Sequence, residues 1–554
     1  MIGERVRMWG SRQGPADVVF TNARVTTGVA GRPTQEAVAI RAGRISGVGS
    51  HADLSGLIDA RTDVVDLGGR RVVPGLIDSH IHFVRAGRNW VDEARWDDAN
   101  TLAEALDVIS RAAAARPAGA WIVVLGGWHA GQFAERRPPT RAELDAVAPG
   151  HPVYAQESYT RAFLNTRAMA ACGVTGAGAA PDGGAYEVDT TGEPTGVVTG
   201  VPAFNHCLSR ALDFDVDRSA ESTKALVAEL AAFGLTGVVD MGGRSRMNID
   251  AYRPLFQLHR RGELDLRVRL FMHVFGSADE EEGELDAYMT YIRPGFGDDL
   301  LRVVGIGEIA SARWYDADGL EQVVLSPEER EQFARMSERA IRLGWAMNIH
   351  GVADPTVSQL LSVWEELDPE LRARARLAIS HADFTTPETL ERMRALGVGV
   401  TVQHWMTVGA GDLAQVLGEQ PVRQAPPLRT MLDLGMKVGA GTDAMVAASA
   451  NPWHALHWLV TGVNRGRGPS RDATQLLTRE EALIAYTAGS SWFGGDETSA
   501  GTLEPGKLAD LAVLSADYFE VADDDIPAIR SELTLVGGRP THVGAAFAGL
   551  TAQD

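Results

Sequence analysis

Short apolar stretches recur through the middle of the chain, and most of them end on a polar residue. Segments with apolar residues at helical spacing, such as 327–344 and 386–397, separate them. This alternation is typical of βα units around a parallel sheet. Eight such stretches predict an α/β fold with a closed (β/α)8 barrel. They are residues 75–83, 235–243, 267–275, 301–309, 345–353, 376–384, 398–405 and 437–445.

The two ends of the chain have a different pattern, with short β-branched runs interrupted by Gly, Asn and Asp. This pattern predicts a small β-sandwich domain built from residues 1–73 and 504–554. The barrel then occupies residues 74–503. The segment of about 84–234 is too long for a single βα crossover. It predicts an insertion after the first barrel strand, with a helix at 102–116. Active sites of such barrels lie at the carboxyl ends of the strands, so we expect the insertion to form part of the pocket wall or a lid.

Two histidines, His80 and His82, lie two positions apart at the end of the first predicted strand, in PGLIDSHIHF (residues 74–83). Strand alternation places both on one side, with Cα atoms about 6.6 Å apart. Two imidazoles at that spacing can chelate one divalent cation. Taken alone, a histidine in an apolar run is more often a core residue than a ligand.

Four further polar residues end other predicted strands: Glu308, His350, His381 and Asp443. Each lies where a barrel presents groups to its catalytic face. Histidines and carboxylates that converge on one pocket predict a metal site. Zn²⁺ is the first expectation for such a ligand set, and Mn²⁺ and Fe²⁺ are alternatives. We expect one or two ions per chain.

Several motifs resemble the amidohydrolase superfamily, and the resemblance covers nearly the whole chain in motif order. Two long stretches resemble its amidohydrolase-3 branch, which includes N-substituted formamide deformylases. The motifs are PGLIDSHIHF, the H-x-x-x-D of His350–Asp354, SHAD at 380–383 and GTDAMV at 441–446, and the two stretches are 126–154 and 477–514.

The resemblance implies a metal-dependent hydrolase with a distorted (β/α)8 barrel and a β-sandwich from the two termini. It implies that His80 and His82 bind the more buried metal. His350 and His381 would bind a second metal, or one of them would complete a single-metal site. Asp443 would ligate the metal and act as general base on a metal-activated water, which is chemistry that such a carboxylate can perform.

The chain departs from many relatives at the fourth strand, where they carry a bridging carboxylated lysine. No lysine lies between positions 225 and 436, and Lys224 falls in a helix-like run, so a lysine bridge is excluded. Glu308 is the natural replacement. It bridges two metals, binds one, or forms a salt bridge with Arg313, and the sequence leaves these alternatives open.

Aromatic residues and histidines near the strand ends are candidates for the substrate wall, since an aromatic-lined pocket suits an apolar group. Plain packing is the alternative at each position. The resemblance puts a histidine near Thr160, which this chain lacks, so its substrate contacts differ there. Asp240 is expected to be a structural hydrogen-bonding group. The wall candidates are Trp128, His129, Tyr159, His273, His404 and Trp405.

Composition narrows the functional class. The 554 residues carry a formal net charge of −21, which disfavours nucleic-acid binding because that needs a positive surface. Cys172 and Cys207 show no metal or disulfide spacing and are expected to be reduced. No secretory leader is visible and no apolar run of about 18 residues occurs, so we expect a cytoplasmic protein without a membrane span. A homodimer is left open.

The main hypothesis is hydrolysis of a C–N bond in a small-molecule linear amide or N-formyl or N-acyl amine. A deaminase or cyclic-amide hydrolase is an alternative, but a deaminase-like H-x-x-E after the fifth strand is absent, since Ala353 stands there. A non-catalytic binding or regulatory protein on a hydrolase scaffold is a third hypothesis. The intact Asp443 argues against it, because a protein without catalysis needs no general base.

Overall fold

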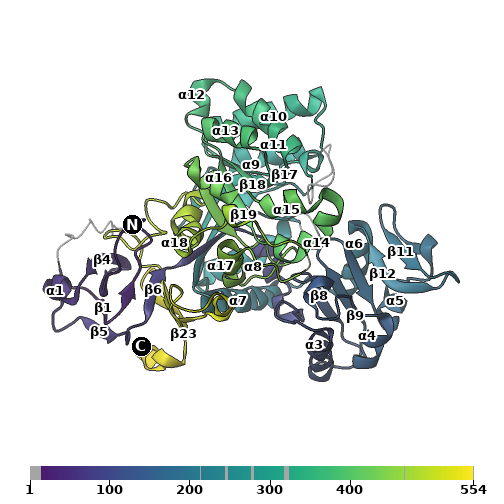
Figure 1. Ribbon diagram of the computed structural model, residues 1–554, viewed down its shortest axis with the longest axis horizontal. Coiled ribbons are helices and arrows are strands. Elements are labelled where there is room, and N and C mark those ends of the chain that lie inside the picture. Colours follow the sequence, from purple (N-terminus) through teal and green to yellow (C-terminus); the bar gives the residue numbers. More distant parts are fainter. Residues whose placement is uncertain are drawn as a thin grey trace, which may run out of the picture.

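The computed structural model describes residues 14–212, 214–243, 248–275, 280–316, 323–466 and 468–552 (Figure 1). Its centre is a (β/α)8 barrel, and all eight predicted strands are confirmed. The strands are parallel and follow chain order around the ring. They are β7 (Leu76–Ile81), β13 (Leu235–Asp240), β14 (Arg267–Met272), β16 (Leu301–Glu308), β17 (Ala346–Ala353), β18 (Leu377–Phe384), β19 (Gly399–Gln403) and β20 (Val438–Gly441).

The first and last strands meet at their carboxyl ends. The backbone N–H of Asp443 donates to the carbonyl of His80 at 2.8 Å, and the N–H of His82 donates to the carbonyl of Ala444 at 3.0 Å. The carboxylate of Asp78 accepts from the Thr442 hydroxyl at 2.6 Å and from the Thr442 N–H at 3.1 Å. Residues more than 350 positions apart therefore close the ring beside the histidine pair.

Helices pack around the barrel, and their sequences carry the expected end signals. In α10, Ser326 and Glu329 form a capping box and Pro327 occupies the first turn. Its apolar side, with Phe333, faces the barrel core. No helix in the described part of the chain is long and apolar enough to cross a membrane. The main barrel helices are α7 (Val216–Ala232), α8 (Arg253–Arg261), α10 (Pro327–Arg342), α11 (Asp354–Glu366), α13 (Pro387–Leu396), α14 (Met406–Leu417) and α17 (Pro452–Thr461).

The two chain ends form two further sheets that share one hydrophobic cluster, with Phe20, Val72 and Leu511 among its members. An ion pair between Arg267 of β14 and Asp510, at 2.7 Å, joins this region to the barrel. One sheet has the order β4 (Arg44–Gly49), β3 (Ala37–Arg41), β1 (Val18–Thr21), β5 (Asp63–Asp66), and the other β2 (Arg24–Val25), β6 (Arg71–Pro74), β21 (Leu511–Leu514), β22 (Ser531–Val536), β23 (Arg539–Val543).

The insertion after β7 folds into a sheet of its own, on the opposite side of the barrel from the terminal sheets (Figure 1). The helix expected at 102–116 is α3 (Leu102–Ala115). Both cysteines are free and buried in this unit. The sheet order is β11 (Ala185–Val188), β12 (Pro194–Thr199), β10 (Arg161–Leu164), β9 (Val153–Glu157), β8 (Ile122–Leu125), with helices α4 (Arg141–Val147), α5 (Thr166–Cys172) and α6 (Val201–Ala211).

Candidate metal centre

The structure brings all six predicted ligands together at the carboxyl ends of the barrel strands. Each of them lies in or directly after a strand whose apolar residues hold it in the core, so the barrel itself fixes their positions. All six side chains are buried. They are His80 and His82 from β7, Glu308 from β16, His350 from β17, His381 from β18 and Asp443 after β20.

The carboxylate of Glu308 lies in the middle of the cluster. Its Oε1 is 3.4 Å from Nε2 of His82, and its Oε2 is 3.6 Å from Nε2 of His80. On the other side, Oε2 is 3.0 Å from Nδ1 of His350 and 3.5 Å from Nε2 of His381. One carboxylate thus faces two separate pairs of imidazoles. Glu308 lies on the fourth barrel strand, where the sequence predicts it to replace a bridging lysine.

Asp443 faces the first histidine pair. Its Oδ1 is 3.0 Å from Nε2 of His82 and 3.6 Å from Nε2 of His80. Asp443 has φ of 54° and His381 has φ of 78°, in the left-handed region that residues other than glycine rarely adopt. Such backbone conformations persist where the surrounding structure holds them, and they are common at functional sites.

The donor set fits a divalent metal ion. Three groups have ligand atoms within 4.8 Å of one another: His80, His82 and Glu308; His80, His381 and Asp443; and Glu308, His350 and His381. Nε2 of His80 is buried and makes no hydrogen bond to any described residue. Two ligands about 2.0–2.1 Å from a shared ion in a tetrahedral site are about 3.4 Å apart. The separations of 3.4–3.6 Å across this cluster match that value.

Hydrogen bonds on the outer sides of the rings orient the first histidine pair. Nδ1 of His80 lies 3.0 Å from the Ser380 hydroxyl, and Nδ1 of His82 lies 2.6 Å from the carbonyl of Gly242. The Ser380 hydroxyl in turn donates to Oδ1 of Asn348 at 2.9 Å. These contacts direct both Nε2 atoms toward the carboxylates, an arrangement typical of metal-binding histidines.

Two residues at the site have no signal in the sequence pattern. Oδ1 of Asp316 lies 3.2 Å from Nε2 of His350, and its carboxylate also accepts from the N–H groups of Val352 and Ala353. The ring of Tyr315 lies over the ring of His350, with centroids 4.2 Å apart. Both residues follow β16 in irregular backbone, where neither helical nor strand spacing marks them.

The charges of the cluster are strongly coupled. Burial alone would raise the pKa of Glu308, but His80, His350 and His381 hold it well below its usual range. Burial lowers the pKa of His80, yet Glu308 and Asp443 raise it to about 10. The two carboxylates therefore need positive charge beside them, which either a proton or a metal ion supplies.

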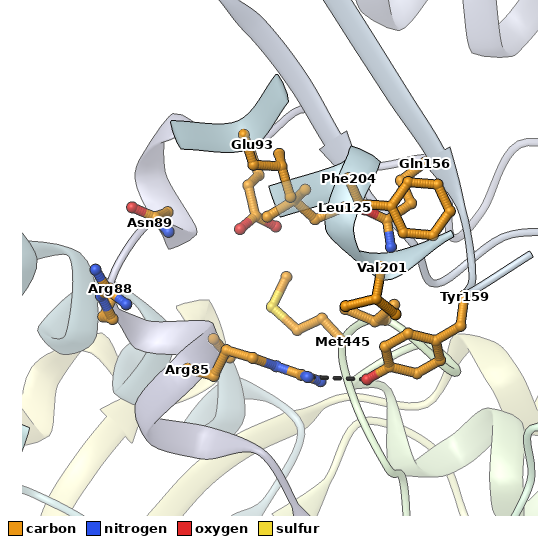
Figure 2. A pocket seen from close by; sticks show the side chains of 13 residues that line it. Arg85, Arg88, Asn89, Glu93, Leu125, Gln156, Tyr159, Val201, Phe204 and Met445 are labelled. Atoms are coloured by element: carbon orange, nitrogen blue, oxygen red, sulfur yellow. Dashed lines mark hydrogen bonds between the residues drawn. The ribbon is translucent and has the colours of Figure 1, made fainter. Parts of the chain in front are cut away.

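A cavity lies beside the metal cluster, between the barrel and the insertion (Figure 2). Met445 follows the ligand Asp443 by two residues and lines the cavity on the barrel side. Tyr159 and Phe204 line it on the insertion side. The Tyr159 hydroxyl accepts a hydrogen bond at 2.8 Å from Nη1 of Arg85, which follows the predicted ligand His82 by three residues. The insertion therefore forms one side of this cavity.

Of the six predicted wall residues, Tyr159 lines this cavity, and the other five do not. Trp128 is fully buried in the core of the insertion, where its ring stacks on Phe133 with centroids 5.6 Å apart. Nε2 of His129 lies 2.9 Å from Oδ2 of Asp412 on α14, so His129 connects the insertion to a barrel helix. These positions correspond to the packing and structural alternatives.

Of the remaining three, His273 and His404 are buried in the barrel and Trp405 is partly buried. The ring of His273 packs against Phe275, with centroids 4.3 Å apart. Burial lowers the pKa of His404 to about 3, so its imidazole is neutral at ordinary pH. The indole N–H of Trp405 donates to Oδ2 of Asp383 at 2.9 Å. None of these contacts reaches the cavity that Tyr159 lines.

Comparisons with known proteins agree with this fold. The model of a family described as "Amidohydrolase family" matches residues 63–542. The chain is similar to an N-substituted formamide deformylase of Arthrobacter pascens, with 27% identity over 94% of this chain and 97% of the relative. The structure is similar to that of an uncharacterized metal-dependent hydrolase from Pyrococcus horikoshii OT3, with TM-score 0.66, 22% identity and coverage of 92% and 99%. It is also similar to atrazine chlorohydrolase TrzN from Arthrobacter aurescens TC1 complexed with zinc, with TM-score 0.52, 18% identity and coverage of 95% of each chain.

Proposed function

The chain belongs to the amidohydrolase family and is a hydrolytic enzyme, and from this premise we propose that it cleaves the C–N bond of a linear amide, an N-formyl or N-acyl amine, with zinc as the metal. The observation that carries this proposal is the position of Asp443. Its carboxylate lies 3.0 Å from the ligand histidine His82, and the chain continues from it into the wall of the cavity. A base, a metal centre and a substrate space therefore share one edge of the barrel.

The ligand set divides around Glu308. His80 and His82 would hold one ion together with Glu308 or Asp443, and His350 and His381 would hold a second together with Glu308. A bound ion of this kind lowers the pKa of a coordinated water and polarises a carbonyl. The outer contacts of His80 and His82 keep their Nε2 atoms in place for it.

Asp443 performs the proton transfers in this proposal. Its Oδ1 faces His82, which leaves Oδ2 to accept a proton from the attacking water. Burial would raise its pKa, but His80 and His82 hold the pKa well below the usual range, so the carboxylate is ionised at neutral pH. The same oxygen then donates that proton to the departing nitrogen, which leaves as a neutral amine.

The relative named N-substituted formamide deformylase supports the N-formyl class, since the chain matches it over nearly its full length. The cavity adds that the substituent on nitrogen is apolar in part, because Phe204, Val201 and Met445 contribute to its lining. Formamides with aromatic or aliphatic substituents on nitrogen are therefore the first substrates to test.

The test is hydrolysis of a panel of N-substituted formamides and acetamides, followed as release of formate or acetate. We expect turnover by protein with bound Zn²⁺, loss of turnover after chelation and recovery on adding Zn²⁺. Undiminished hydrolysis by protein verified to be free of metal would contradict the proposed role of the cluster. Release of ammonia from ring amines, with no amide hydrolysed, would favour a deaminase instead.

A further inference from the structure

The guanidinium of Arg85 is a charged group beside the metal cluster that the proposed reaction does not use. Arg85 lies on α2 (Phe83–Gly87), three residues after His82. Its Nη1 donates to the Tyr159 hydroxyl at 2.8 Å (Figure 2). Its Nη2 is buried and makes no hydrogen bond to the described residues. A guanidinium is always charged and carries five donors, so Arg85 has donors left to bind a ligand.

Arg85 lies close to the ring of His82, one of the predicted metal ligands. A single carbon placed on Gly243 would lie 3.3 Å from Nδ1 of His82 and 3.6 Å from Nη1 of Arg85. The guanidinium therefore lies on the outer side of the His82 ring. Arg85 shares the cavity with Met445, two residues after Asp443, so a ligand that Arg85 binds there would lie beside the strand end that carries Asp443.

Other charged residues line the cavity, but they have partners. The guanidinium of Arg88 lies over the ring of Phe214, 4.5 Å from its centroid, and both Arg88 and Glu93 interact with further protein groups. In Figure 2, Glu93 and Arg85 lie on opposite sides of the cavity. The Nη2 donors of Arg85 therefore remain to bind a ligand.

The rest of the lining is largely apolar. Phe204 and Val201 of α6 face the cavity together with Leu125 and with Met445 after β20 (Figure 2). Leu208 also lines it. The cavity therefore combines a cation next to the metal cluster with an apolar wall beyond it. A ligand that matches both parts has an anionic group and an apolar group on neighbouring atoms.

We propose that Arg85 binds a carboxylate on the amine half of the substrate, so that the preferred amides are N-formyl or N-acyl derivatives of apolar amino acids. Tyr159 is a positioning residue here: its hydroxyl accepts from Nη1 and leaves Nη2 to pair with the substrate carboxylate. The apolar side chain of the amino acid packs against Phe204 and Met445. This inference rests on the proposed amide hydrolysis.

The experiment compares two substrates that differ in one group, racemic N-formylphenylalanine and N-formyl-2-phenylethylamine, which lacks the carboxylate. Because hydrogen bonds to a charged group contribute about 1.5–3 kcal/mol, we expect wild type to favour the anionic substrate roughly 10- to 150-fold in kcat/KM. Arg85→Gln should remove most of this preference and change hydrolysis of the neutral substrate less than about threefold. Arg88→Gln is the matched control in the same cavity and should keep the preference.

Two outcomes overturn the inference while leaving amide hydrolysis intact. One is an equal fall in kcat/KM for both substrates in Arg85→Gln, which would mean that Arg85 acts on the reacting carbonyl or the released acid. The other is a wild-type enzyme that does not distinguish the two substrates.

A binding measurement keeps the inference testable if neither amide is hydrolysed, which would count against the proposed function alone. N-methanesulfonylphenylalanine cannot be cleaved as an amide, and its binding to the metal-loaded enzyme can be measured by calorimetry. We expect it to bind more tightly than its analogue without the carboxylate, and we expect Arg85→Gln to abolish the difference. Equal affinities in wild type would overturn the inference.

Discussion

Oδ1 of Asp316 lies 3.2 Å from Nε2 of His350, on the side of the imidazole that faces away from Glu308. Nδ1 of the same ring lies 3.0 Å from Glu308. The ring is therefore held between two carboxylates, and Asp316 fixes which nitrogen faces the metal cluster. A carboxylate in this position also makes the imidazole a better ligand.

Asp316→Ala should weaken binding at the His350 side of the cluster by about 10- to 100-fold, since loss of such outer partners has effects of that size. Metal titration of apo protein measures it, together with kcat/KM. Asp354→Asn is the matched control, because its carboxylate caps the backbone of Thr386 away from the cluster. Unchanged affinity in Asp316→Ala would show that the backbone alone orients His350.

Glu308→Gln tests whether the cluster holds two ions. The carboxylate faces both histidine pairs, at 3.4 Å from His82 and 3.5 Å from His381, and a neutral amide is a poor bridge between cations. We expect metal content per chain to fall from two equivalents toward one, measured by elemental analysis after dialysis. A wild-type protein with a single equivalent, unchanged in the variant, would instead assign Glu308 an orienting role.

Asp443→Asn separates proton transfer from metal binding. The variant keeps an oxygen that can face His82 but cannot accept a proton, so kcat should fall by about 10²- to 10⁴-fold, the usual contribution of a general base. Metal content should stay near the wild-type value. If activity and metal are lost in the same proportion, Asp443 acts mainly as a ligand.

Asp240 should give the protein an unusual pH dependence of stability. Burial raises its pKa from 3.8 to about 7, although backbone N–H groups of Val84 and its neighbours oppose the shift. The folded state then binds a proton that the unfolded state has released. The stability that Asp240 contributes is fully present below about pH 4 and is lost as pH rises toward 7, and the change is on the order of 4 kcal/mol.

Asp240→Asn removes this titration. Its Tm relative to wild type should therefore rise between pH 5 and pH 8, measured by thermal unfolding at fixed metal concentration. Asp66→Asn is the control of opposite sign, because the Gly68 N–H and Asn22 lower the pKa of Asp66, so its effect is constant across that window. A difference between wild type and Asp240→Asn that does not change with pH would show that Asp240 is ionised throughout.

Much of the barrel could be predicted from the sequence because its strands are buried on both sides and read as apolar runs. The polar residue that ends a run stands out for the same reason, which is how Glu308 and Asp443 were found. Lys224 lies on α7, as its helix-like run predicts, and it pairs with Glu263.

The residues that could not be predicted do not stand at the end of an apolar run. Asp316 follows β16 in irregular backbone, and Arg85 lies in a short helix, so neither belongs to a periodic pattern. Trp128 illustrates the converse problem. A tryptophan at this position suits a substrate pocket, but the core of the insertion also needs large aromatic side chains. Only its packing against Phe133 shows that Trp128 is a core residue.

Backbone hydrogen bonds join β7 to the residues after β20, so the candidate metal site is complete only when the last barrel strand is in place. The amide of Asp443 and the carbonyl of His80 are hydrogen-bonded to one another, so the groups that would hold the ion also fasten the first strand to the last. A growing polypeptide that lacks its final strand has the histidine pair but neither Asp443 nor the fastening. We therefore expect the histidine pair to reach its final arrangement only after the last strand has joined the barrel.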